Sequence, residues 1–330
     1  MKKVLSFIVV LALVASAVFA GGQREERTYP SRPVTSIVPF APGGGSDTLV
    51  RAVMRSLQLP NNQPMVAVNV EGAGGFIGAM RTFNSPSDGY TIMTHNTMDL
   101  ISYYLTGQAA FPIWSDLTTI ALLVMDYNVI STNRIAAEEF GWRTIEDVVE
   151  WTRANPDQRI RWGTSGGTLG DNMIGSISVA RALGIEDSMN FVLYDSGAAA
   201  RTASLQNEIQ ISVNSASELP GVVASGDNIP LLVINNTRIA SLPDVPSTLE
   251  RGIDVTLTKP RGFFGPAGMN PEHVRILEDA LRAVSEDPEF QETMAQLGFD
   301  VRFVDGATAS RMARDWYAIV RAFADEMAAN

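Results

Sequence analysis

Three glycine-rich segments, each between a strand-like run and a helix-like pattern, constrain the fold of this chain most strongly. In each case a short apolar run ends at the glycines, and apolar residues at helical spacing follow. The segments are Pro42–Asp47, Gly72–Gly75 and Thr164–Thr168. Glycine permits tight turns, and units of strand, loop, helix and strand place parallel strands side by side with helices on the sheet. The sequence therefore predicts an α/β fold.

Hydrophobic periodicity predicts the individual elements. The predicted strands are Val34–Phe40, Met65–Val70, Tyr90–Thr94, Val124–Ser131, Ile160–Trp162, Phe191–Tyr194, Ile209–Asn214 and Pro230–Asn235. The predicted helices are Leu49–Leu57, Ile77–Phe83, Thr144–Arg153, Asp171–Leu183, one capped by Asn270, and a last one over Ala307–Ala328. We expect Ser46 or Asp47 to cap the first helix, because both are favoured N-cap residues.

Length and composition set the number of domains and exclude several kinds of chemistry. The 330 residues are 45% hydrophobic, enough for a large core and too many for one small domain, so we expect two lobes. Without cysteine, the chain has no disulfide, thiol nucleophile or cysteine-bound metal. Its two histidines, His95 and His273, are too few for a histidine-rich metal centre. A net charge of −11 argues against nucleic-acid binding, which depends on neutralising phosphates.

The N-terminal 20 residues have the pattern of a secretory signal peptide. A basic start is followed by an apolar run that ends in Val18-Phe19-Ala20, and we expect cleavage after Ala20. The apolar run is marginal for the ~30 Å of a bilayer core, which favours cleavage over a membrane anchor. Residues 21–27 are predicted to be a flexible leader. The mature, exported chain then has 23 basic and 36 acidic residues, and Lys259 is its only lysine.

Sequence patterns of common enzymes are incomplete in this chain. The run Gly72–Gly78 resembles the nucleotide fingerprint of short-chain dehydrogenases. Such enzymes need a Tyr-x-x-x-Lys pair, and Val255 stands four residues before Lys259. A P-loop is excluded because Lys259 follows Thr258, and no Gly-x-Ser-x-Gly elbow accompanies His95. An exported oxidoreductase, or a hydrolase that uses His95, is kept only as an alternative.

The glycine-rich segments can bind anions without lysine. Each precedes a predicted helix start, where free backbone N–H groups and the helix dipole attract a negative group. Each N–H bond to a charged oxygen contributes roughly 1.5–3 kcal/mol. The alternative is that the three segments are ordinary tight turns. Their common context favours carboxylate binding.

An ordered set of strings makes the chain resemble the substrate-binding proteins of tripartite tricarboxylate transporters. These Bug-type proteins are periplasmic solute receptors. The matching strings are Tyr29–Val34, Val38–Asp47, Gly72–Ala79, Asp88–Thr91, Leu242–Gly252 and Gly262–Gly268.

The resemblance implies a two-lobed α/β binding protein of the Venus-flytrap type, each lobe a mainly parallel sheet flanked by helices. By analogy, residues 28–127 and 237–330 form one lobe and residues 128–236 the other. A small di- or tricarboxylate would bind between the lobes and be delivered to integral-membrane permease subunits. The protein would be a periplasmic monomer without catalysis, cofactor or metal. The alternative is that the same kind of binding protein acts as a ligand sensor for a signalling partner and not in transport.

The resemblance also assigns binding residues. Backbone N–H groups of the first glycine-rich segment would hold one carboxylate, directly or through water, and residues of the second lobe would take the distal carboxylate. The assigned residues are Phe40, Ala41, Gly44, Gly45, Ser46, Asp47, Ala73, Gly74, Thr94, His95, Asn96, Thr164, Ser165, Gly167, Thr168, Ser196 and Gly197.

Three residues depart from the family pattern. Asp195 stands where many members are neutral or basic, Asn207 stands where glycine is usual, and His95 is not typical. A histidine and an aspartate near the cleft leave room for a ligand that carries a hydroxyl or amino group.

Overall fold

The computed structural model describes residues 28–110 and 112–329. The predicted signal peptide and leader lie outside these residues. The strands are β1 (Val34–Val38), β2 (Met65–Asn69), β3 (Thr91–Asn96), β4 (Thr118–Asn133), β5 (Ile160–Ser165), β6 (Met189–Tyr194), β7 (Ile211–Ser215), β8 (Asn228–Ile234), β9 (Thr258–Gly265) and β10 (Asp300–Asp305).

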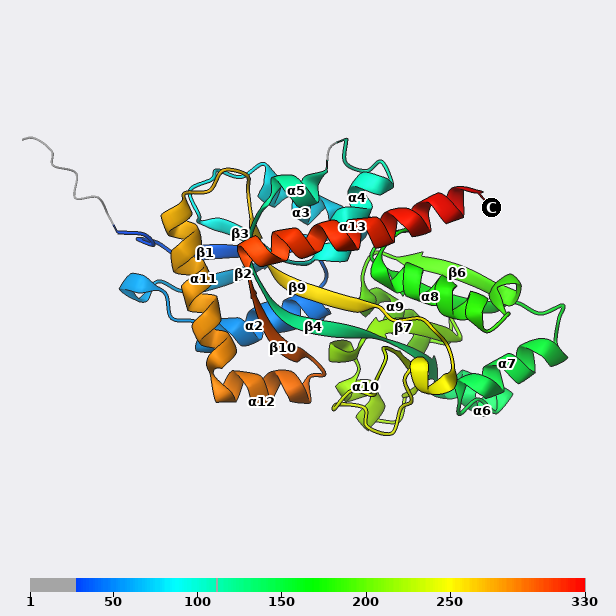
Figure 1. The fold of residues 1–330 in the computed structure, drawn as a ribbon. Coiled ribbons are helices and arrows are strands. Elements are labelled where there is room, and N and C mark those ends of the chain that lie inside the picture. The colour runs from blue at the N-terminus through cyan, green and yellow to red at the C-terminus, as the bar shows by residue number, and fades with distance from the viewer. Residues whose placement is uncertain (1–27, 111, 330) are drawn as a thin grey trace, which may run out of the picture.

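The α-helices lie around the sheet that these strands form (Figure 1). They are α2 (Gly45–Ser56), α3 (Phe76–Phe83), α4 (Thr97–Leu105), α5 (Ile113–Asp116), α6 (Arg134–Phe140), α7 (Ile145–Ala154), α8 (Asp171–Ala182), α9 (Gly197–Leu205), α10 (Pro220–Ala224), α11 (Pro271–Glu286), α12 (Pro288–Gln296) and α13 (Gly306–Ala329). Within the described ranges, no helix is both long and apolar enough to cross a bilayer.

The long strand β4 connects two parts of the sheet. Residues 118–127 of β4 pair with β9, and residues 128–133 pair with β7 and β8. The strand order is β2-β1-β3-β9-β4-β7-β5-β6, with β10 and β8 also on β4. We call β1, β2, β3, β9 and β10 the first part of the sheet, and β5, β6, β7 and β8 the second part.

The sheet is mixed. The outer pairs β1–β2, β1–β3, β5–β6 and β5–β7 are parallel, as strand–helix–strand units require. The central pairs around β4 and β9 are antiparallel. The α/β fold is confirmed, and the parallel arrangement holds at the outer strands of each part.

Local sequence explains several helix starts. Thr144 and Asp147 form a capping box at α7, where a helix is predicted. Asn270 accepts the Glu272 N–H at 2.9 Å, and Pro271 is the first residue of α11. The predicted cap of α2 is wrong: Gly44, in an extended conformation, is the N-cap, and it offers no side-chain hydrogen bond. Ser46 and Asp47 therefore lie in the first turn.

Each part of the sheet has its own apolar core, and α13 contacts both. Leu277, Leu281 and Phe290 pack with strands of the first part, whereas Trp142 and Trp162 pack in the second. Figure 1 shows α13 running along the molecule from the first part towards α8. Its Ala309 lies in a cluster of the first part, and its Val320 and Phe323 pack in the core of the second.

Candidate functional site

A loop that ends at the start of α2 presents the backbone N–H of Gly45 towards the second part of the sheet. Gly43 adopts a left-handed conformation with φ of 80°. Asp47 stabilises this loop, because its carboxylate accepts the Gly43 N–H and the Arg51 Nε–H at 2.9 and 2.8 Å. Burial raises the pKa of Asp47, but the hydrogen bonds from Arg51 and Gly43 outweigh it and lower the pKa. Asp47 therefore shapes the loop and faces its interior.

The first N–H group of α2 binds a carboxylate of the protein itself. Oε1 of Glu218 accepts the Gly45 N–H at 3.0 Å, and Oε2 accepts Nδ2 of Asn214 at 2.9 Å. The Glu218 side chain is 5% exposed, and Arg201 lies 3.9 Å from it. A helix start favours such an anion through its free N–H groups and its dipole. An anion site for a solute at this loop stays a prediction, and in this structure an internal carboxylate accepts its Gly45 N–H.

Two cationic side chains of β9 point into the site, and both form hydrogen bonds and ion pairs with other residues of the protein. Because side chains two residues apart in a strand share a face, Lys259 and Arg261 point the same way. Nζ of Lys259 lies 2.8 Å from Oδ2 of Asp171. It also donates to Asn172 Oδ1 at 2.9 Å and to Ser215 Oγ at 3.1 Å.

The guanidinium of Arg261 likewise bonds to both parts of the sheet. Its Nε donates to Asp126 Oδ2 at 2.9 Å, and Nη1 donates to Ser46 Oγ at 2.9 Å. Its Nη2 donates to Ser215 Oγ, on β7, at 2.8 Å. Burial lowers the pKa of Arg261, but Asp126 and other carboxylates outweigh it and raise the pKa. The ion therefore stays charged and fixes the start of α2 to β7.

Asn96 and Asp171 connect β3 to α8. Asn96 Oδ1 accepts the Met98 N–H at 2.7 Å, which caps α4, and its Nδ2 donates to Asp171 Oδ1 at 2.9 Å. The other oxygen of Asp171 accepts Nδ2 of Asn128 at 2.9 Å. Burial raises the pKa of Asp171, but Lys259 outweighs it and the pKa is lowered. Asp171 is thus an ionised carboxylate with a full set of donors.

His95 supports a loop and does not line the cavity. Its Nδ1 accepts the Asn96 N–H at 2.7 Å, so Nε2 carries the proton and donates to Tyr103 OH at 3.0 Å. Tyr103 in turn donates to the carbonyl of Gly74 at 2.9 Å. Burial, and then the charge of Arg261, lowers the pKa of His95 to about 3. A neutral histidine therefore positions the second glycine-rich loop.

The second and third glycine-rich loops meet between the two parts of the sheet. Gly74, Gly166 and Gly167 all have positive φ. A Cβ on Gly74 would lie 3.2 Å from the Gly167 nitrogen, so glycine permits this close backbone approach. Behind this contact, Ser165 Oγ accepts Nδ2 of Asn172 at 2.9 Å.

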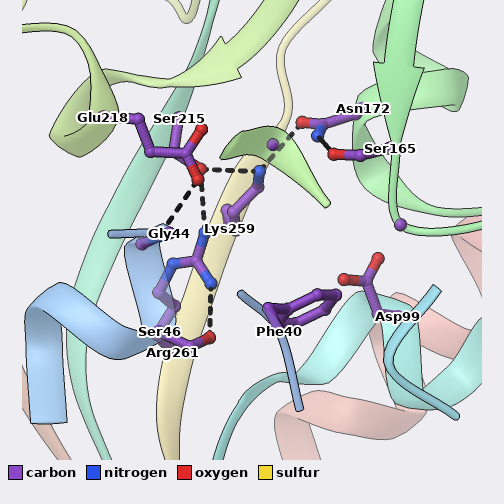
Figure 2. Close-up of a pocket in the computed structure, with 13 residues that line it drawn as sticks. Phe40, Gly44, Ser46, Asp99, Ser165, Asn172, Ser215, Glu218, Lys259 and Arg261 are labelled. Carbon is purple, nitrogen blue, oxygen red and sulfur yellow. Dashed lines mark hydrogen bonds between the residues drawn. The ribbon is translucent and has the colours of Figure 1, made fainter. Parts of the chain in front are cut away.

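The cavity between these groups is small. Its volume is about 30 Å³, the space of about one water molecule. Figure 2 shows the charged side chains around it. The lining residues are Phe40, Gly44, Gly45, Ser46, Asp99, Ser165, Gly166, Asn172, Gly197, Ser215, Glu218, Lys259 and Arg261. Among the residues that the structure describes, no group of three or more acidic or histidine side chains could hold a metal ion.

Six of the assigned residues line this cavity, and eleven do not. The six are Phe40, Gly44, Gly45, Ser46, Ser165 and Gly197. The other eleven are Ala41, Asp47, Ala73, Gly74, Thr94, His95, Asn96, Thr164, Gly167, Thr168 and Ser196. Several of these have structural roles nearby: Ser196 caps α9 by accepting the Ala199 N–H at 3.2 Å.

Sequence reasoning missed all four charged residues that line the cavity. Lys259 and Arg261 carry a usable signal, since they are two residues apart and Lys259 is the only lysine beyond residue 3. Pro260 stands between them, and because proline is rare inside a strand, the sequence does not predict a strand here. No pattern in the sequence around Asp99 or Glu218 indicates that they line a cavity. Of the departures, Asp195 is exposed, and Asn207 adopts the left-handed conformation that glycine or asparagine tolerates.

Comparisons with known proteins match this architecture. Residues 49–327 match the model of the tripartite tricarboxylate transporter family receptor. Protein BugT of Bordetella pertussis is 24% identical over 278 residues, which cover 82% of this chain and 82% of BugT. MatC from Rhodopseudomonas palustris with bound malate has a TM-score of 0.78 at 20% identity, over 90% of this chain and 100% of MatC.

A second R. palustris structure, solved with adipate, has a TM-score of 0.82 at 20% identity, over 90% of this chain and 98% of that one. Such likenesses establish the fold, and the family model establishes the family because it covers most of the sequence. This chain therefore belongs to the tripartite tricarboxylate transporter receptor family.

Proposed function

We propose that the chain is a periplasmic solute receptor that captures a small carboxylate and delivers it to the membrane permease of a tripartite transporter. The proposal takes residues 28–127 and 237–330 as one lobe and residues 128–236 as the other. The change of strand partners between Tyr127 and Asn128 supports this division. The protein has a binding role here and performs no catalysis.

The hydrogen bond from Gly45 to Glu218 carries the proposal. At 3.0 Å, the start of α2 already holds a carboxylate, so its N–H groups are oriented for one. The solute's carboxylate takes the place of the Glu218 carboxylate at this N–H. The malate and adipate bound by proteins of the same fold support a small organic acid as the cargo.

Entry of the solute requires the lobes to separate. Ligand pockets commonly have volumes of about 300–1,000 Å³, whereas this cavity has about 30 Å³. The present conformation is therefore closed on its own side chains. Opening moves Glu218 and Ser215 away from Gly45 and Arg261, and closure then occurs around the solute.

A thermal-shift screen of the purified protein tests the proposal. The panel contains succinate, malate, glutarate, adipate and citrate, together with L-aspartate, L-glutamate and 2-aminoadipate. A ligand that binds only the folded form raises its stability, so at least one acid should raise the unfolding midpoint in a concentration-dependent manner. Absence of any shift across the panel would contradict the proposed function.

A further inference from the structure

Two acidic side chains, Asp99 and Glu218, and two cations, Lys259 and Arg261, line the cavity, and both cations are already bound. Each of the three donor bonds of Lys259 goes to a protein acceptor, and each nitrogen of Arg261 donates to a side chain. Asp126 and Asp171 neutralise these two cations. A solute carboxylate therefore has to displace Glu218 from the Gly45 N–H, and it finds no uncommitted cation among the lining residues.

Asp99 is the acidic lining residue for which the described residues provide no cationic partner. It is the third residue of α4, is 3% exposed and lines the cavity. Its Oδ1 is buried and has no hydrogen-bond partner among residues 28–110 and 112–329. Within the same residues, the only side-chain hydrogen bond that shifts its pKa is with another acid, Asp171. A buried acceptor without a donor is costly, so such an atom indicates a missing partner.

The surrounding backbone leaves room for Asp99. A Cβ on Gly166 would lie 2.9 Å from Oδ1 of Asp99, and a Cβ on Gly170 would lie 3.0 Å from it. Figure 2 shows Gly44 and Asp99 on opposite sides of the cavity, with the ring of Phe40 between them. The cavity thus has the Gly45 N–H at one end and the unpartnered Oδ1 of Asp99 at the other.

We infer that Asp99 binds a cationic group of the solute, so that the cargo is a carboxylate that also carries a protonated amine. The inference rests on the proposed function and names its substrate class. The carboxylate binds the N–H of Gly45, and the ammonium group donates to Oδ1 of Asp99. The ammonium provides the donor and the positive charge that this buried side chain lacks.

The protonation of Asp99 in the closed, empty cavity is consistent with this assignment. Burial, and then the charge of Asp171, raises the pKa of Asp99, and the side-chain hydrogen bond to Asp171 adds to this, although Lys259 and Arg261 act in the opposite direction. On the same helix, burial and then Asp99 raise the pKa of Tyr103, so this group stays neutral. Without a cation, the site therefore favours the neutral form of Asp99.

Matched pairs of acids test the inference by isothermal titration calorimetry. The pairs differ only in an amino group: succinate and L-aspartate, glutarate and L-glutamate, and adipate and 2-aminoadipate. In at least one pair, the wild-type protein should bind the amino member at least tenfold more tightly. Asp99→Asn should reduce that ratio at least tenfold and leave the affinity for the plain acid nearly unchanged.

The controls separate the inference from the proposed function. Asp325→Asn, on the exposed face of α13, should keep the wild-type ratio. If Asp99→Asn does not fold, Asp99→Ser removes the same charge. Equal or tighter binding of the plain acids in every pair, or an unchanged ratio in the Asp99 variant, would overturn the inference while the proposed function stands. No binding of any acid would contradict both.

Discussion

Nζ of Lys259 lies 2.8 Å from Oδ2 of Asp171, and this buried ion pair joins β9 to the first turn of α8. Removal of one partner of a buried pair leaves an uncompensated charge, which costs about 3–5 kcal/mol. Lys259→Met should therefore lower the free energy of unfolding by about that amount, measured by urea denaturation. The double variant Lys259→Met/Asp171→Asn should recover part of the loss, because neither charge then remains alone.

An exposed ion pair provides the control for this prediction. Arg251 and Glu146 are 3.5 Å apart, and both side chains are at least 40% exposed. Arg251→Met should change the free energy of unfolding by less than about 1 kcal/mol. Similar losses in the Lys259 and Arg251 variants would show that the buried pair has no special role.

The stability of the protein should decrease in acid because of His95. The folded protein holds the pKa of His95 at about 3, whereas an unperturbed histidine titrates at 6.5. The unfolded chain therefore takes up a proton that the folded protein excludes. The His95 contribution to the unfolding free energy is complete above pH 6.5 and falls by up to about 1.4 kcal/mol per pH unit as the pH drops below it.

Urea titrations between pH 7.5 and 5 measure this slope. His95→Gln should flatten it relative to the wild type, and His273→Gln should retain it because His95 is still present. The pKa of Asp99 is raised, so that carboxyl contributes a slope of opposite sign, common to all three proteins. Equal slopes for the wild type and His95→Gln would refute the role of His95.

A methyl group on Gly45 should obstruct the binding site. A Cβ at this position would lie 2.7 Å from Nη2 of Arg261 and 3.1 Å from Oγ of Ser217. Gly45→Ala should displace the guanidinium and weaken binding of the acid that gives the largest thermal shift by at least tenfold. Gly221→Ala is the matched control, because a Cβ on Gly221 meets no atom within 4 Å. Equal affinities of the two variants would exclude Gly45 from the site.

Neutralising Glu218 should strengthen carboxylate binding. A neutral amide competes less well for the Gly45 N–H, because hydrogen bonds to charged groups contribute more than neutral ones. Glu218→Gln should raise the affinity for the same acid about three- to tenfold in calorimetry, and Glu139→Gln, on the exposed side of α6, should leave it unchanged. Weaker binding in the Glu218 variant would indicate that this carboxylate contacts the solute directly.

The sequence predicts most elements of the fold because their signals are local. The apolar runs locate β1, β2 and β3 within a few residues, and Thr144 and Asn270 mark helix starts correctly. Strand β9 is missed because Pro260 and its charged neighbours have the composition of a loop. The central antiparallel pairing is missed because it joins segments far apart in the chain.

In the candidate site, too, features with a local sequence signal could be predicted and long-range contacts could not. Glycines that precede a helix start are visible locally, and Gly44 and Gly45 line the cavity. The bond from Gly45 to Glu218 spans 173 residues, and nothing near Glu218 in the sequence indicates it. The assignment of all these loop residues to ligand binding, Gly44 and Gly45 included, stays a prediction until a solute is seen in place.

The continuity of β4 determines how the proposed receptor can move. One unbroken strand serves both parts of the sheet, and its pairing with β9 and with β8 has register shifts on either side of Tyr127 and Asn128. Such irregularities increase the twist of a strand locally. Under the proposed function, a strand shared by both lobes favours their rotation about it over sliding past each other. Under the proposed function, arrival of a solute changes a single angle, and that angle is the signal that a permease can read.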